Sequence, residues 1–155
     1  RRVMLHEANE AEAELLARAA VAGQVFSREE VMALGVADPD GPAVSLMERE
    51  IIRQRPTAGL LWTQIYVFTS QTLHETAYQR IPPEERARLH LRLGEYLERH
   101  HAHIPEALAL MADHFARAGV PERARRARHG LIAHAEAFDA TSEAAALRDA
   151  GSASA

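Results

Sequence analysis

One strand-like run in a chain otherwise patterned for helices constrains the fold most strongly. Residues 62–68 are rich in β-branched and aromatic side chains, and alternate residues fall on opposite faces, with Trp62, Gln64, Tyr66 and Phe68 on one of them. Ile51 and Ile52 indicate a second short strand, and the loop that separates the two runs is too long for a tight hairpin. The sequence therefore predicts a small two-stranded ribbon.

Three short helices are predicted ahead of this ribbon. An apolar stripe at helical spacing marks the first, over residues 7–23. Ser27 and Glu30 have the spacing of a capping box and open the second. The third is predicted over about 43–50, after a turn-forming stretch at 38–42. Three helices followed by a small ribbon is the order of elements in a winged helix.

The pattern returns to helix from residue 70 onward. The pre-proline restriction at Ile81 ends one helix, and Pro83 can begin the next. Further helices are predicted over 83–100, 105–118, 121–138 and 141–150. The two middle ones form a hairpin of the tetratricopeptide type, about 34 residues long. Small residues occur where its helices would come closest: Ala112, Ala116, Ala118, Gly119, Ala124 and Ala127. One such unit cannot bury its own face, so further repeats are expected after it.

These segments predict a mainly α protein in two parts. A winged-helix-like unit, three helices plus the ribbon, occupies residues 1–69. A helical hairpin or tetratricopeptide-like unit occupies 70–150, and 151–155 form a flexible tail.

The composition excludes several kinds of chemistry. All 18 basic residues are Arg, and without Lys a P-loop cannot be built. The absence of Cys excludes disulfides, thiolate metal sites and a cysteine nucleophile. Any ATP chemistry must therefore lie on another part of the polypeptide. No apolar run approaches the roughly 18 residues of a membrane span, and no signal-peptide pattern is present, so a cytoplasmic location without membrane association is expected.

Other functional patterns have simpler explanations. The histidines at 100, 101 and 103 end a helix, where a solvated helix terminus is favoured over a metal site. The arginines at 123–128 favour interhelical ion pairs or a solvated face over phosphate contact. The predicted helix at 43–50 carries Glu48 and Glu50 but no Asn or Gln, so a nucleic-acid partner is not expected. No catalytic constellation is found, and the chain is not expected to be an enzyme.

Three segments together resemble a known family. Residues 15–27 look like the opening of the winged-helix region in bacterial STAND-type signalling ATPases, and 66–78 resemble the stretch that follows its ribbon. The segment 84–98 is similar to the family's next helix. Members include maltose-regulator-like transcription activators and the ATPases attached to class III adenylate cyclases. The family often has His two residues after the Phe, a position that Ser70 occupies here, and His74 lies one helical turn further on.

The resemblance implies a regulatory segment of signal transduction that holds no cofactor. ATP is expected on an upstream nucleotide-binding domain, and the partners are that domain, downstream helical repeats of the same polypeptide, or another protein. The candidate interface residues are Leu60, Leu61, Trp62, Ser70 and His74. The alternative that remains open is a DNA-binding winged-helix transcriptional regulator.

Overall fold

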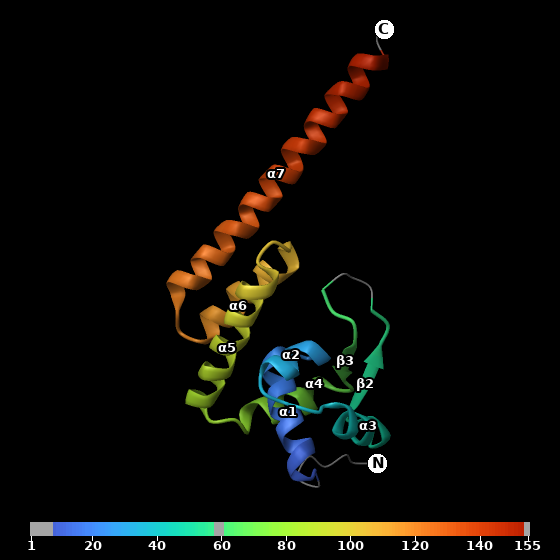
Figure 1. Ribbon diagram of the computed structural model, residues 1–155, viewed down its shortest axis with the longest axis vertical. Coiled ribbons are helices and arrows are strands. Elements are labelled where there is room, and N and C mark those ends of the chain that lie inside the picture. Colours follow the sequence, from blue (N-terminus) through green and yellow to red (C-terminus); the bar gives the residue numbers. More distant parts are fainter. Residues whose placement is uncertain (1–7, 58–60, 154–155) are drawn as a thin grey trace.

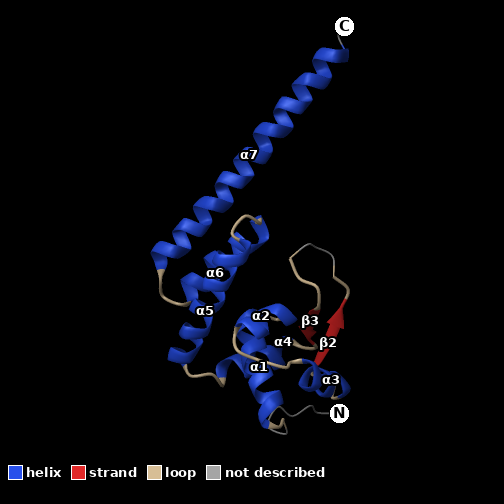
Figure 2. Ribbon diagram, in the orientation of Figure 1, coloured by secondary structure: helices blue, strands red, loops and turns tan. Residues whose placement is uncertain are grey.

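The computed structural model describes residues 8–57 and 61–153 and confirms a mainly helical fold with a small sheet (Figures 1 and 2). The elements follow the order α1 (Glu10–Ala22), β1 (Val25–Ser27), α2 (Arg28–Ala33), α3 (Asp40–Glu48), β2 (Ile52–Arg55), β3 (Ile65–Phe68), α4 (Gln71–Gln79), α5 (Pro83–His101), α6 (Pro105–Arg117) and α7 (Pro121–Ala153).

The sheet has three antiparallel strands in the order β1-β3-β2, so β3 lies in the middle. Tyr66 of β3 pairs with Phe26 of β1 on one side and with Gln54 of β2 on the other. Tyr66 and Phe68 are buried, as the predicted alternation requires. The predicted start at Trp62 was wrong, since β3 begins at Ile65 and Trp62 and Gln64 are only half-buried. The predicted ribbon is confirmed in β2 and β3, but β1 was missed, because a strand of three residues is too short to show a period of two.

Local capping determines where the first helices begin. Asn9 caps α1, its side chain accepting a hydrogen bond from the Glu12 amide at 2.8 Å. The capping box before α2 is confirmed: the Glu30 amide donates to Ser27 Oγ, and the Ser27 amide donates to Glu30 Oε1. The prediction of a turn over 38–42 was wrong, since α3 already begins at Asp40. Amides in the first turn of a helix need no intrahelical partner, so Pro42 is tolerated in the first turn of α3.

Helices α5, α6 and α7 pack side by side in sequence order. The predicted hairpin of α6 and α7 buries Ala112, Phe115, Ala124 and Ala127, whereas Ala116 and Gly119 are exposed. Arg123 of α7 forms interhelical ion pairs with two acids of α5, reaching Glu98 at 2.7 Å and Glu95 at 3.4 Å.

The predictions for the C-terminal end were wrong. The separate helices at 121–138 and 141–150 and the start of the tail at 151–155 are one continuous helix, α7, to Ala153; residues 154–155 lie outside the described range. This stretch is rich in alanine, the best helix former, and has no proline after Pro121. Gly130 does not break the helix, and its ideal Cβ would lie 3.3 Å from Leu108 of α6.

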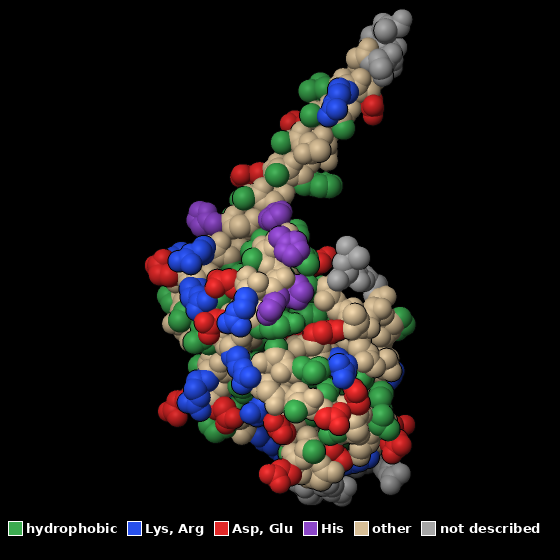
Figure 3. Space-filling model, viewed as in Figure 1, with side chains coloured by type: hydrophobic (Ala, Val, Ile, Leu, Met, Phe, Trp, Pro, Cys, Tyr) green, Lys and Arg blue, Asp and Glu red, His purple; other side chains and the backbone are tan. Residues whose placement is uncertain are grey.

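The second half of α7 projects from the body of the molecule (Figure 1). Every side chain from residue 132 to residue 151 is exposed, including Phe138 at 73% and Leu147 at 74%. The space-filling view shows hydrophobic side chains along this rod (Figure 3).

The two predicted units share one hydrophobic core. Helices α1 and α2 pack against α5, which joins the N-terminal helices to the C-terminal ones. Helix α4 packs against α1 and β3. The boundary after residue 69 stays a prediction, and the helix just beyond it lies against elements of the first unit.

Candidate functional site

An apolar groove lies between the sheet and α6. One wall consists of residues of the three strands and of the segments between β2 and β3, and the other belongs to α6; we call it the wing groove, and its lining residues are Val25, Arg55, Pro56, Leu61, Trp62, Ile65, Glu106, Ala109 and Leu110. Its volume of about 510 Å³ lies in the range of protein cavities that bind ligands or bulky side chains. The groove contains two of the predicted interface residues, Leu61 and Trp62.

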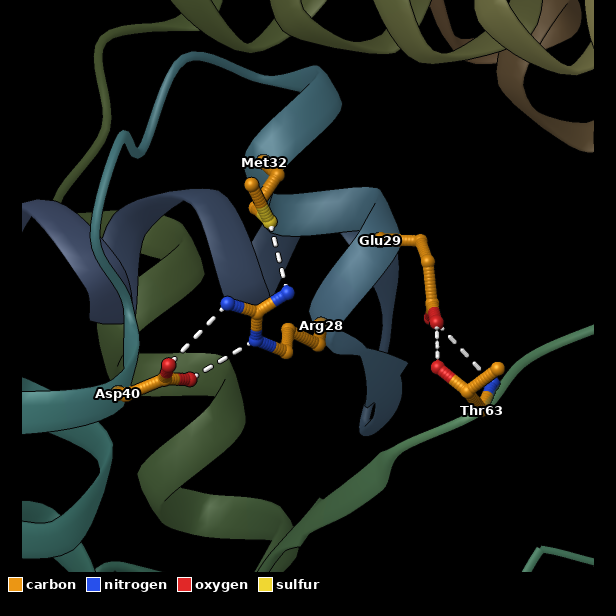
Figure 4. Close-up of polar contacts among 5 residues, drawn as sticks. All are labelled: Arg28, Glu29, Met32, Asp40 and Thr63. Carbon is orange, nitrogen blue, oxygen red and sulfur yellow. Dashed lines mark hydrogen bonds and ion pairs between the residues drawn. The ribbon is translucent and has the colours of Figure 1, made fainter.

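Contacts on both sides hold Trp62 in the groove wall. The half-buried indole meets the His101 ring of α5 edge to face, with centroids 5.7 Å apart. The next residue, Thr63, is bound by Glu29 of α2: the Thr63 amide donates to Glu29 Oε1 at 3.1 Å, and its hydroxyl donates to the same oxygen (Figure 4). Burial opposes ionisation of Glu29, but the hydrogen bonds from Thr63 and the backbone leave its pKa lowered overall.

Helix α2 is itself fixed by the residue before Glu29. The Arg28 guanidinium donates two hydrogen bonds to the Asp40 carboxylate at the start of α3, at 2.8 and 3.1 Å (Figure 4). The segment that carries Trp62 is therefore connected through α2 to α3. A bidentate pair of this kind fixes orientation as well as distance.

The groove combines an apolar surface with one charge of each sign. Val25 lies on an edge strand and is 46% exposed, which is high for a large aliphatic side chain of a small sheet. Arg55 stands on the strand side and Glu106 on the α6 side. Both are exposed, and within the described residues neither forms an ion pair. These two charges are available to a partner.

The structure brings together only some of the predicted interface residues. Leu61 and Trp62 line the wing groove, whereas Leu60 lies outside the described residues. Ser70 is instead the N-cap of α4, and its Oγ accepts a hydrogen bond from the Leu73 amide at 3.1 Å. His74 is half-buried, with Nε2 3.0 Å from the Ala20 carbonyl oxygen of α1. Ser70 and His74 thus have local structural contacts away from the groove.

A chain of polar side chains at the junction of α4, α5 and α6 was missed. Tyr78 Oη lies 2.9 Å from His90 Nε2, and His90 Nδ1 lies 2.9 Å from His114 Nδ1. We call these three residues the histidine chain. Both histidines are 2% exposed. The signal in the sequence was a histidine at a core-facing helical position, His90 between Leu89 and Leu93 and His114 beside Phe115.

Burial makes both histidines hard to protonate. It is the main cause that lowers the pKa of His90 to about 4, and the neighbouring His114 and Arg117 lower it further. Burial likewise lowers the pKa of His114 to about 4, although Asp113 acts in the opposite direction. Both imidazoles are therefore neutral near pH 7.

The described residues, 8–57 and 61–153, lack a metal-binding cluster and a membrane-spanning helix. They hold no group of three or more His, Cys, Asp or Glu side chains placed to bind a metal ion. None of their helices combines the length and apolarity that crossing a bilayer requires. Comparison with known proteins gives no match to a family model, a curated protein or a solved structure.

Proposed function

We propose that this chain is a non-catalytic, cytoplasmic interaction segment of a larger nucleotide-dependent signalling ATPase of the STAND type. In this proposal the wing groove packs against an upstream nucleotide-binding domain. The projecting half of α7 presents its surface to downstream helical repeats or to a partner protein. Nucleotide state then shifts the population between two packings of the segment, without any chemistry in this chain.

The wing groove is the observation that supports this proposal most directly. Leu61 and Trp62, chosen from the sequence as interface residues, line an apolar groove flanked by the charges of Arg55 and Glu106. Apolar surface of this kind, rimmed by polar residues, marks sites of protein association. The absence of Lys supports the placement of ATP on another domain, because the chain itself cannot form a P-loop.

The proposal predicts that substitutions in the groove change ATP affinity on the upstream domain. Trp62→Ala or Leu61→Ala, in the polypeptide that includes that domain, should shift the dissociation constant for ATP by about 5-fold to 150-fold, the usual range of coupling between sites. Isothermal titration calorimetry measures the shift. Val44→Ala is the matched control, because this exposed apolar residue of α3 lies outside the lining of the groove. Unchanged ATP affinity in both groove variants would contradict the proposal.

The alternative is a DNA-binding winged helix, and one observation favours it. Arg53 and Arg55 are exposed on β2, where a wing would meet phosphates. Against it, α3 and the turn after it expose Asp40, Glu48 and Glu50, while Arg49 is held by Glu12 at 2.5 Å. We therefore expect no gel shift with duplex DNA at low salt. A shift that weakens steeply as salt rises would favour the alternative.

A further inference from the structure

The histidine chain is a buried polar link between two layers of helices, beside the direct packing of α1 and α2 on α5. Helix α4 packs against α1 and β3, and His74 ties it to α1 through the Ala20 carbonyl. On the other side, Tyr78 reaches His90 of α5, which in turn reaches His114 of α6. The sheet side and the hairpin side of the molecule are thus joined at this point through three ring side chains.

This link needs a neutral pair of imidazoles. Two Nδ1 atoms 2.9 Å apart share one hydrogen, so one ring donates and the other accepts. If both rings were protonated, two N–H groups would face each other and the contact could not persist. With a single added proton, the pair would be a cation removed from water, which costs free energy unless an anion compensates it.

The charges around the pair do not supply full compensation. From α6, Asp113 favours a positive charge, but its carboxylate is already paired with Arg117 at 3.1 Å. Arg117 and, from α5, Arg86 disfavour protonation of His90. Arg86 lies over the Tyr78 ring, 4.9 Å from its centroid, so a cation already occupies the α4 side. On the α4 side, Glu75 and His74 line the same cavity as His90, and Glu75 accepts a hydrogen bond from Gln71. Two arginines thus face two carboxylates, so protonation of the pair adds a positive charge that these groups do not balance.

Two further features concern the surroundings of the pair: one nitrogen without a hydrogen-bond partner and a cavity beside His90. His114 Nε2 is buried and has no hydrogen-bond partner among the described residues, in either tautomer. In addition, a cavity of about 370 Å³ reaches His90 at the junction, and Tyr78, Asp113 and Arg117 also line it. The cavity has room for water to solvate an imidazolium once the contact loosens.

From this geometry we propose that the histidine chain is a proton-sensitive latch between α4 and the α5–α6 pair. In the neutral state it holds the two layers together. Proton uptake by the pair opens the junction while the helices and the sheet on each side stay folded. The latch rests only on contacts within this chain and is independent of the proposed function.

Spin-label distances between α4 and α6 test the latch. The chain has no cysteine, so Gln79→Cys and Ala116→Cys, both at exposed positions, give one label on each side. From pH 7 to pH 5 the ratio of open to closed molecules should rise by about 20-fold if opening lets one histidine titrate near 6.5 instead of near 4. A second pair within the N-terminal helices, Glu14→Cys with Glu48→Cys, should keep its distance and thus report that this side stays folded.

Substitutions in the latch distinguish it from general acid sensitivity. His90→Leu with His114→Leu should abolish the pH response, whereas His134→Leu, at an exposed histidine of α7, should leave it intact. Tyr78→Phe removes only the hydroxyl and should raise the open ratio at pH 7 by about fivefold. An acid response that survives in the double variant, or equal distances at pH 7 and pH 5 in the parent, overturns the latch. Should the double variant fail to fold, an unchanged open ratio in Tyr78→Phe overturns it instead.

Discussion

Between pH 7 and pH 4.5 the free energy of unfolding is expected to fall by about 2 kcal/mol. Burial lowers the pKa of His90 and of His114 to about 4 in the folded protein, against about 6.5 in the unfolded chain. Well above pH 6.5 both histidines are neutral in the folded and the unfolded state, so they add no pH dependence to the free energy of unfolding. As the pH falls below 6.5, the unfolded chain binds two protons that the folded protein does not, and stability is lost until the folded pKa is reached.

Glu30 opposes part of this loss. Burial raises the pKa of its carboxyl from 4.5 to about 7, in spite of the hydrogen bonds from Ser27 that act to lower it. Between pH 7 and pH 4.5 the folded protein therefore binds a proton that the unfolded chain does not, which increases stability as the pH falls. The unfolded chain binds two extra protons, on His90 and His114, and the folded protein binds one, on Glu30, so the unfolded chain holds one proton more. This corresponds to about 1.4 kcal/mol per pH unit.

Urea denaturation at intervals from pH 7 to pH 4.5 measures this slope. Glu30→Gln preserves the capping box, since Gln serves at the same position, and removes the opposing proton. The loss over the same range should then grow to about 5 kcal/mol. His134→Gln, at an exposed histidine of α7, is the control and should follow the parent curve. Stability that increases toward acid in the parent, or that has the same slope in Glu30→Gln, contradicts the assignment.

Gly94→Ala is expected to destabilise the protein by about 2 kcal/mol, opposite to the usual effect of this change in a helix. An ideal Cβ at position 94 would lie 2.8 Å from Phe115 Cε1 and 2.9 Å from Cδ1, closer than carbon atoms pack. The Phe115 ring cannot retreat easily, because it is fully buried and the Arg123 guanidinium lies over it at 4.4 Å. The added methyl group must therefore push α5 and α6 apart.

Two companion variants show whether this contact is the cause. Gly41→Ala, in α3, meets no atom within 4 Å and should be neutral or stabilising by up to about 1 kcal/mol. In a Phe115→Leu background the smaller side chain leaves room, so Gly94→Ala should cost much less than in the parent. Chemical denaturation of the parent, the three single variants and the Phe115→Leu/Gly94→Ala double variant gives the comparison. If Gly94→Ala stabilises as Gly41→Ala does, the close approach of α5 and α6 at this point is wrong.

Part of the candidate site could be predicted from the sequence. Leu61 and Trp62 are bulky apolar residues at the start of the predicted strand, and both line the groove. The opposite wall, with Glu106 and Leu110, could not be predicted because it belongs to a helix about forty residues further along the chain. Ser70 occupies the position at which the family often has His, and His74 is a candidate because it lies one helical turn further on. The contact of His74 with α1 explains its presence equally well.

The sequence by itself determined the elements whose signals are local. Three such features are the capping box before α2, the proline boundary between α4 and α5 and the alternation in β3. Each depends on neighbours within about four residues, so it can be predicted from the sequence alone. Tertiary structure alone decided β1, which exists only because β3 pairs with it, and the histidine chain, whose members come from three helices. It also decided that the second half of α7 stands free, because the periodicity of a helix shows which residues share a face but not what covers that face.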